Sequence, residues 1–249
     1  MLSQFIWWGS IILEVLVLLR GSQHRLISKY PIFYSYIFFV FAQDVVLIWL
    51  SQNKAYPTFY WIAEFLSVLF GCLVVFEIFR VALAAFPGVA RMSRYALAFV
   101  FLVALAKALL SAANDSSSLM GNNGLEVERA LRTIQAIAIV ALVALFVLYS
   151  IPFGRNLRGI LIGYGLFVGV RLTSLTFVPP SGHNFWFYLY SASFFAALGI
   201  WLAHMWSYQA NSVFESSLGP LENDYQRAAA ATRRRLQAAR GQLAKAVRS

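Results

Sequence analysis

Seven long apolar stretches, separated by short polar segments, constrain the fold of this 249-residue chain more than any other feature. A helix needs about 20 predominantly apolar residues to cross the hydrocarbon core of a bilayer. The stretches that come close to this length are Phe5–Leu19, Ile32–Leu50, Pro57–Ala85, Tyr95–Ala113, Ala130–Tyr149, Gly159–Val178 and Phe185–Tyr208. The sequence therefore predicts an all-α integral membrane protein with about seven transmembrane helices.

The composition argues against a soluble globular protein. Hydrophobic residues make up 60% of the chain and charged residues only 12%, whereas soluble domains carry about 25% charged residues. A soluble domain of this length would leave much of that apolar surface in water. No Lys or Arg precedes the first apolar stretch and no small-residue cleavage site follows it, so we expect this helix to be retained.

Basic residues are unequally distributed over the predicted loops, and this bias predicts an orientation. Lys and Arg are enriched in the short cytoplasmic loops of membrane proteins. One side carries most of them: Arg20, Arg25, Lys29, Arg80, Arg91, Arg94, Arg155, Arg158, Arg227, Arg233, Arg234, Arg235, Arg240, Lys245 and Arg248. The other side carries only Lys54 and Arg129. We expect an N-terminus outside and a C-terminus in the cytoplasm, in a plasma membrane of the bacterial inner-membrane type.

The composition changes after Tyr208 and predicts two parts. Residues 1–208 are expected to form the seven-helix transmembrane domain, and residues 209–249 a basic, partly helical cytoplasmic tail. The apolar face of Glu222–Ser249 is narrow, so this segment either rests on anionic lipid or is solvated. The net charge of +10 is concentrated beside the bilayer, so the lipid bilayer rather than nucleic acid is the expected partner.

Ionisable residues inside the predicted spans are the main indication of a function. Charged side chains within a bilayer are costly and mark either a functional site or a tight ion pair. Five of them fall at similar predicted depth in the outer third of the membrane: Asp44, Glu64, Lys107, Arg132 and Arg171. Gln135 follows one helical turn deeper than Arg132. The excess of one positive charge favours an outward-facing pocket for a small, anionic ligand; a structural ion-pair network, or snorkelling by the arginines, is the alternative.

A second polar group is predicted in the inner half of the membrane. Glu77 and Arg80 are spaced to pair on one helix face. Glu14 is deeper, and together with the acids of the outer half it would permit a proton path.

No catalytic, cofactor or metal signature accompanies these charges. The chain has three histidines and one cysteine, and their spacing matches no metal site. No nucleophile or metalloprotease motif is present. We therefore expect a non-catalytic, ligand-binding sensor or receptor-like protein rather than an enzyme. A small-solute or proton-coupled transporter and an accessory or scaffold subunit of a membrane complex are the alternatives.

Overall fold

The computed structural model describes residues 2–84, 87–114, 122–148, 154–177, 183–208, 223–234 and 237, and within them it contains helices and short connections but no strand. The helices are α1 (Leu2–Gln23), α2 (Leu26–Lys29), α3 (Pro31–Leu50), α4 (Tyr56–Ala82), α5 (Pro87–Asn114), α6 (Asn122–Leu148), α7 (Arg155–Phe177) and α8 (His183–His204). Each predicted apolar stretch falls on one long helix, whereas the single turn of α2 has no counterpart among the predicted elements.

Five of these helices are long and apolar enough to cross a membrane. The candidate spans are Gln4–Gln23, Pro31–Leu50, Tyr56–Ala82, Glu128–Leu148 and Arg155–Phe177. The protein is thus all-helical in its described part, with apolar helices that are consistent with a membrane-embedded protein.

Prolines begin several of the helices. Pro31 and Pro87 are the first residues of α3 and α5, and Pro57 is the second residue of α4. Proline suits the first turn because the N–H that it lacks would have no partner within the helix. Between α1 and α2 the chain turns at Arg25, which adopts a left-handed conformation with φ 54°. These local signals separate the apolar stretches into individual helices.

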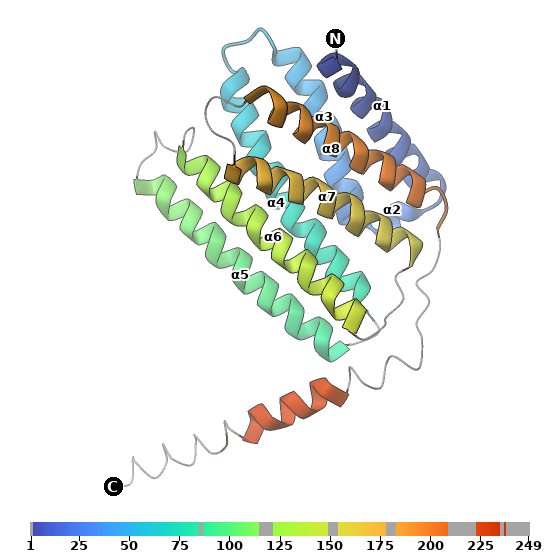
Figure 1. The fold of residues 1–249 in the computed structure, drawn as a ribbon, viewed down its shortest axis with the longest axis vertical. Helices are drawn as coiled ribbons and strands as arrows, with labels where there is room; N and C mark the ends of the chain where they lie inside the picture. The colour runs from blue at the N-terminus through green and yellow to red at the C-terminus, as the bar shows by residue number, and fades with distance from the viewer. Residues whose placement is uncertain are drawn as a thin grey trace.

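Six of the long helices form a closed ring, and α5 packs on its outside (Figure 1). Around the ring the neighbours are α1, α8, α7, α6, α4 and α3, which returns to α1. Helix α5 lies against α4 and α6, while α4 and α7 also touch each other across the ring.

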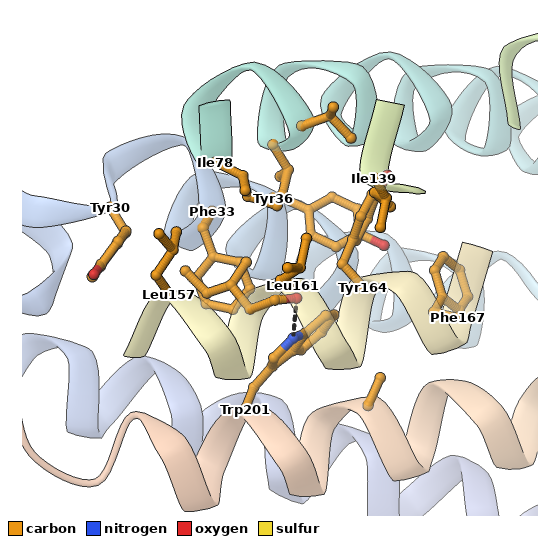
Figure 2. Close-up of a cluster of buried hydrophobic side chains, with 14 of the residues drawn as sticks. Tyr30, Phe33, Tyr36, Ile78, Ile139, Leu157, Leu161, Tyr164, Phe167 and Trp201 are labelled. Atoms are coloured by element: carbon orange, nitrogen blue, oxygen red, sulfur yellow. Dashed lines mark hydrogen bonds between the residues drawn. The ribbon is translucent and has the colours of Figure 1, made fainter. Parts of the chain in front are cut away.

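The interior of the ring is filled by aromatic and aliphatic side chains from α3, α4, α6, α7 and α8 (Figure 2). The rings of Phe33 and Trp201 meet edge to face at 5.1 Å between centroids, and those of Tyr36 and Tyr164 at 6.1 Å. The indole N–H of Trp201 donates a hydrogen bond to the Ile160 carbonyl at 3.3 Å, which ties α8 to α7. This packing forms one side of the polar site described below.

The outward surface of the bundle is apolar. Phe5 is 71% exposed, Trp49 84% and Val147 71%, and every long helix carries at least one large exposed apolar side chain. Contiguous apolar surface of this kind is unfavourable in water and favourable in lipid. The surface therefore agrees with the composition of the chain.

Segments with a predicted cytoplasmic location meet at one end of the bundle. The guanidinium of Arg20, near the end of α1, lies 3.7 Å from the ring centroid of Trp206. Arg155, at the start of α7, donates a hydrogen bond of 2.9 Å to the Ala203 carbonyl near the end of α8. These contacts bring three of the basic segments together at one end of the bundle.

Part of the predicted tail is also described. Residues 223–234 are helical, and Tyr225 packs against the core close to Gly88 at the start of α5. Residues 209–222, 235–236 and 238–249 of the tail lie outside the described residues.

Candidate functional site: a polar pocket beside a buried ion-pair network

A cavity of about 390 Å³ lies among α1, α3, α4, α7 and α8. Its aromatic lining consists of Trp7, Tyr36, Tyr60, Phe167, Tyr190 and Phe194. Its polar lining includes Ser10, Gln43, Asp44, Glu64 and Ser67. Ligand pockets have volumes of about 300–1,000 Å³ and combine mostly apolar walls with a few polar groups. The cavity has both properties, and we call it the pocket.

The pocket lies toward the end of the bundle that holds the start of α1 and the connection between α3 and α4. Trp7 lies in the first two turns of α1, Asp44 in the last two turns of α3, and Tyr60 in the second turn of α4. This is the end opposite the basic segments.

Two glutamates and two arginines form a buried network beside the pocket. Glu128 accepts two hydrogen bonds from Arg171, at 2.7 Å from Nε and 2.9 Å from Nη2. Glu64 Oε1 lies 3.4 Å from Arg171 Nη2 and 3.9 Å from Arg132 Nη2. Glu128 Oε1 is also 3.8 Å from Arg132 Nε. We call these four residues the network; their formal charges sum to zero.

The network joins α4, α6 and α7 and touches the pocket at three places. Glu64 itself lines the pocket. The guanidinium carbon of Arg132 lies 5.1 Å from the Phe167 ring centroid, and that of Arg171 lies 4.5 Å from the Tyr190 ring centroid. Both rings are part of the pocket lining, so each arginine of the network contacts an aromatic side chain of the pocket wall.

Gln135 packs behind the network rather than in the pocket lining. Its Nε2 donates to the Val68 carbonyl at 3.1 Å and to Cys72 Sγ at 3.2 Å. Its Oε1 accepts from the Tyr164 hydroxyl at 3.2 Å and from Arg132 Nη1 at 3.5 Å. These bonds tie α6 to α4 and α7 and help to orient Arg132.

Asp44 lies in the pocket wall but outside the network. It lines the pocket on α3, and in the described part of the chain it forms no ion pair. The preceding residue, Gln43, has a buried Oε1 that finds no hydrogen-bond partner among the described residues. The wall formed by α3 therefore carries a carboxylate without an ion pair and an amide oxygen without a donor among the described residues.

Lys107 lies on α5, the helix outside the ring. Its side chain lies outside the described part of the structure. The prediction that Lys107 lies with the other charges therefore falls outside the described residues.

Glu14 lies on the pocket side of α1, beyond the pocket lining. It is four residues from Ser10 and seven from Trp7, so all three lie on one face of the helix. The side chain is 0% exposed, and neither carboxylate oxygen has a hydrogen-bond partner among the described residues.

Glu77 and Arg80 form a separate group at the basic end. Glu77 accepts hydrogen bonds from the backbone N–H groups of Ile32 at 3.1 Å and Phe33 at 2.7 Å. Arg80 Nη2 lies 3.4 Å from Glu77 Oε1. The first N–H groups of a helix lack acceptors within it. The Glu77 carboxylate accepts two of these hydrogen bonds at the start of α3. Glu77 therefore helps to hold α4 against the start of α3, whereas Glu14 has no such partner among the described residues.

Glu128 is the site residue that the sequence analysis missed. The predicted apolar stretch begins at Ala130 and leaves Glu128 out, whereas α6 begins at Asn122 and Glu128 is 6% exposed. The i, i+4 spacing of Glu128 and Arg132 was the available signal. Including Glu128 changes the balance, because the charges around Arg132 and Arg171 no longer have a positive excess.

The fold and the site define an all-helical protein with apolar helices, consistent with a membrane protein, that holds a polar pocket beside a neutral ion network. No protein-family model, curated protein or solved structure matches the chain. Within the described ranges, no group of three or more His, Cys, Asp or Glu side chains is placed to hold a metal ion.

Proposed function

We propose that the protein crosses the plasma membrane seven times, with its N-terminus outside, and binds a small ligand in the pocket as a non-catalytic sensor. The observation that carries this proposal is the double position of Glu64, which lines the pocket and pairs with Arg132 and Arg171.

The proposed topology is supported by helix length, surface and charge. Helices α5 and α8, which complete the seven, have 28 and 22 residues, and about 20 residues suffice to span the hydrocarbon core. Exposed apolar side chains surround the bundle, and three basic segments meet at one end. The positive-inside rule assigns that end to the cytoplasm, so the pocket faces outward.

A ligand in the pocket would act on the packing of three helices. Contact with Glu64 competes with its ion pairs to α6 and α7. A ligand shifts a conformational equilibrium only as far as it binds one state more tightly than the other. The ion pairs of Glu64 provide such a difference, because their geometry depends on how α4, α6 and α7 sit together.

Cysteine labelling tests the topology and the access to the pocket. In a Cys72→Ala background, Ser10→Cys should react with a membrane-impermeant maleimide added from outside right-side-out vesicles. Ser22→Cys, at the other end of α1, is the matched control and should react only from the cytoplasmic side. Reaction of Ser10→Cys only from the cytoplasmic side would contradict the proposed orientation.

Native mass spectrometry tests for an occupant. In Leu47→Trp, the indole ring should project from α3 and fill the pocket. Protein purified from its membrane should then no longer retain a small molecule. Val45→Trp, on the exposed side of the same helix, is the control and should retain it. If the two variants and the wild type carry the same molecules, or none, the sensor proposal fails and a scaffold role becomes the better explanation.

The position of Glu14 favours one alternative, a proton-coupled transporter. A buried acid one turn beyond the pocket lining would carry a proton between the two sides. Proteoliposomes with a lumenal pH dye, given the molecule found by mass spectrometry, separate the two functions. A transporter would show ligand-dependent proton flux that Glu14→Gln abolishes, whereas a sensor would show none.

A further inference from the structure

We propose that the ligand of the pocket is a small organic amine in its protonated form, with its ammonium group beside Asp44. This inference rests on the proposed ligand-binding function and assigns the charge and the hydrogen-bonding character of the ligand.

The charge of the pocket wall favours a cation. Its charged lining residues are Asp44 and Glu64, and no Lys or Arg lines it in the described part of the chain. Glu64 is balanced by Arg132 and Arg171, but no basic side chain in the described ranges pairs with Asp44. An anion placed here would meet an uncompensated carboxylate. Our expectation of an anionic ligand depended on a positive excess that Glu128 removes.

The hydrogen-bonding groups of the pocket favour a ligand that donates. Gln43 Oε1, in the pocket lining, is a buried acceptor without a donor among the described residues, and both oxygens of Glu14, one helical turn beyond the lining, are in the same state. Buried polar groups are nearly always hydrogen-bonded, so each unsatisfied group needs an explanation. A protonated primary amine brings three N–H donors and a positive charge, which complement Gln43 Oε1 and Asp44, two neighbouring residues of the lining. A quaternary ammonium would match the charge but provide no N–H donor.

The aromatic lining suits both the body and the charge of such a ligand. Six aromatic side chains surround the cavity. Two of them, Phe167 and Tyr190, already contact arginine guanidinium groups on the network side. Aromatic faces attract cations, and ligand ammonium groups are recognised in this way. A compact aromatic or aliphatic body would fill the rest of the cavity.

Calorimetry on the full chain in lipid nanodiscs tests the charge of the ligand. The probes are phenethylamine, its neutral analogue 2-phenylethanol, the anion 3-phenylpropionate and the quaternary cation benzyltrimethylammonium, each corrected for binding to empty nanodiscs. Hydrogen bonds to charged groups contribute about 1.5–3 kcal/mol, which corresponds to about tenfold or more in affinity. Phenethylamine should therefore bind about tenfold more tightly than 2-phenylethanol, with benzyltrimethylammonium between them and 3-phenylpropionate weakest.

Variants assign the preference to Asp44. Asp44→Asn should remove the advantage of phenethylamine over 2-phenylethanol, whereas Asp44→Glu keeps the charge and should retain it. Asp224→Asn in the exposed helix after the bundle is the control for net charge and should behave as the wild type. Should Asp44→Asn fail to fold, the ranking of the four probes on the wild type still tests whether the ligand is a cation that donates hydrogen bonds.

The outcomes separate this inference from the proposed function. Tighter binding of 3-phenylpropionate or equal binding of all probes would overturn the amine assignment and leave a ligand pocket. Absence of binding by every probe would also overturn the amine assignment. If Leu47→Trp in addition leaves the co-purified molecules unchanged, the ligand-binding function falls with it.

Discussion

The network and Glu14 are two buried acidic sites within one bundle, and they are stabilised in opposite ways. In the network, Glu64 and Glu128 are held by two arginines from α6 and α7. Glu14, on α1, is equally buried but has no partner among the described residues. The difference separates paired charges that hold three helices together from a buried carboxyl group without a partner in the described part of the chain.

The energetic difference follows from desolvation. A buried ion pair contributes little net stability, but removal of one partner leaves a charge that the interior cannot solvate. The network should therefore be sensitive to single substitutions. Glu14 already lacks a partner, so its substitution has no ion pair to break.

The largest effect should come from Arg132→Met, which removes a fully buried guanidinium of the network. Loss of one partner from a buried ion pair costs about 3–5 kcal/mol, and we expect that decrease in the free energy of unfolding. SDS titration in bicelles measures it. Arg91→Met, exposed on α5, is the matched control and should change stability little. A loss below about 1 kcal/mol would show that Arg132 is not an essential partner of the network.

A double substitution sharpens the comparison. Glu64→Leu together with Arg132→Met removes one acid and one base and leaves the bidentate pair of Glu128 and Arg171. Because the remaining charges are balanced, the double variant should be more stable than Arg132→Met alone. Coupling energies within such networks are about 0.5–3 kcal/mol. Additive losses in a double-mutant cycle would contradict a shared network.

Much of the fold could be predicted because lipid makes helices easy to recognise. Apolar stretches of the required length correspond to the long helices, and prolines mark several of their starts. The predicted span began at Ala130, whereas α6 begins at Asn122 and its candidate span at Glu128. The first turns of α6 are polar, and a polar helix end resembles a loop in sequence. That difference concealed Glu128.

The candidate site could be predicted only in part. Similar depth grouped Glu64, Arg132 and Arg171, because helical rise converts sequence position into depth, and the structure pairs Glu64 with both arginines. Depth does not specify rotation about the helix axis. Helices in lipid are apolar on all sides, so the pattern does not distinguish the face toward the ring from the face toward lipid. The isolation of Asp44 from the network could therefore come only from the structure.

A third buried acid, Glu77, provides an intermediate case, since its partners are mainly backbone N–H groups. Glu77→Gln keeps one acceptor oxygen and removes the charge that favours a helix N-terminus. Loss of such a cap costs about 1 kcal/mol, so we expect a decrease of that size in the free energy of unfolding. Arg80→Gln, which removes the half-exposed partner, is the control and should cost less. An effect as large as that of Arg132→Met would show that the negative charge of Glu77 is as important for stability as the ion pairs of the network.

The smallest effect, and the one with opposite sign, should come from Glu14→Gln. A carboxyl group buried without a partner is costly as a carboxylate and must otherwise take up a proton, whereas an amide is neutral at every pH, so the ligand-free variant should be more stable than the wild type by about 1 kcal/mol or less. Phenethylamine should stabilise the wild type and the variant by similar amounts, because Glu14 lies beyond the pocket lining and a ligand stabilises each form according to how tightly it binds. Unfolding by SDS with and without the amine measures both effects. A substantial loss of stability without ligand would mean that Glu14 has a structural partner, and the contrast with the network would disappear.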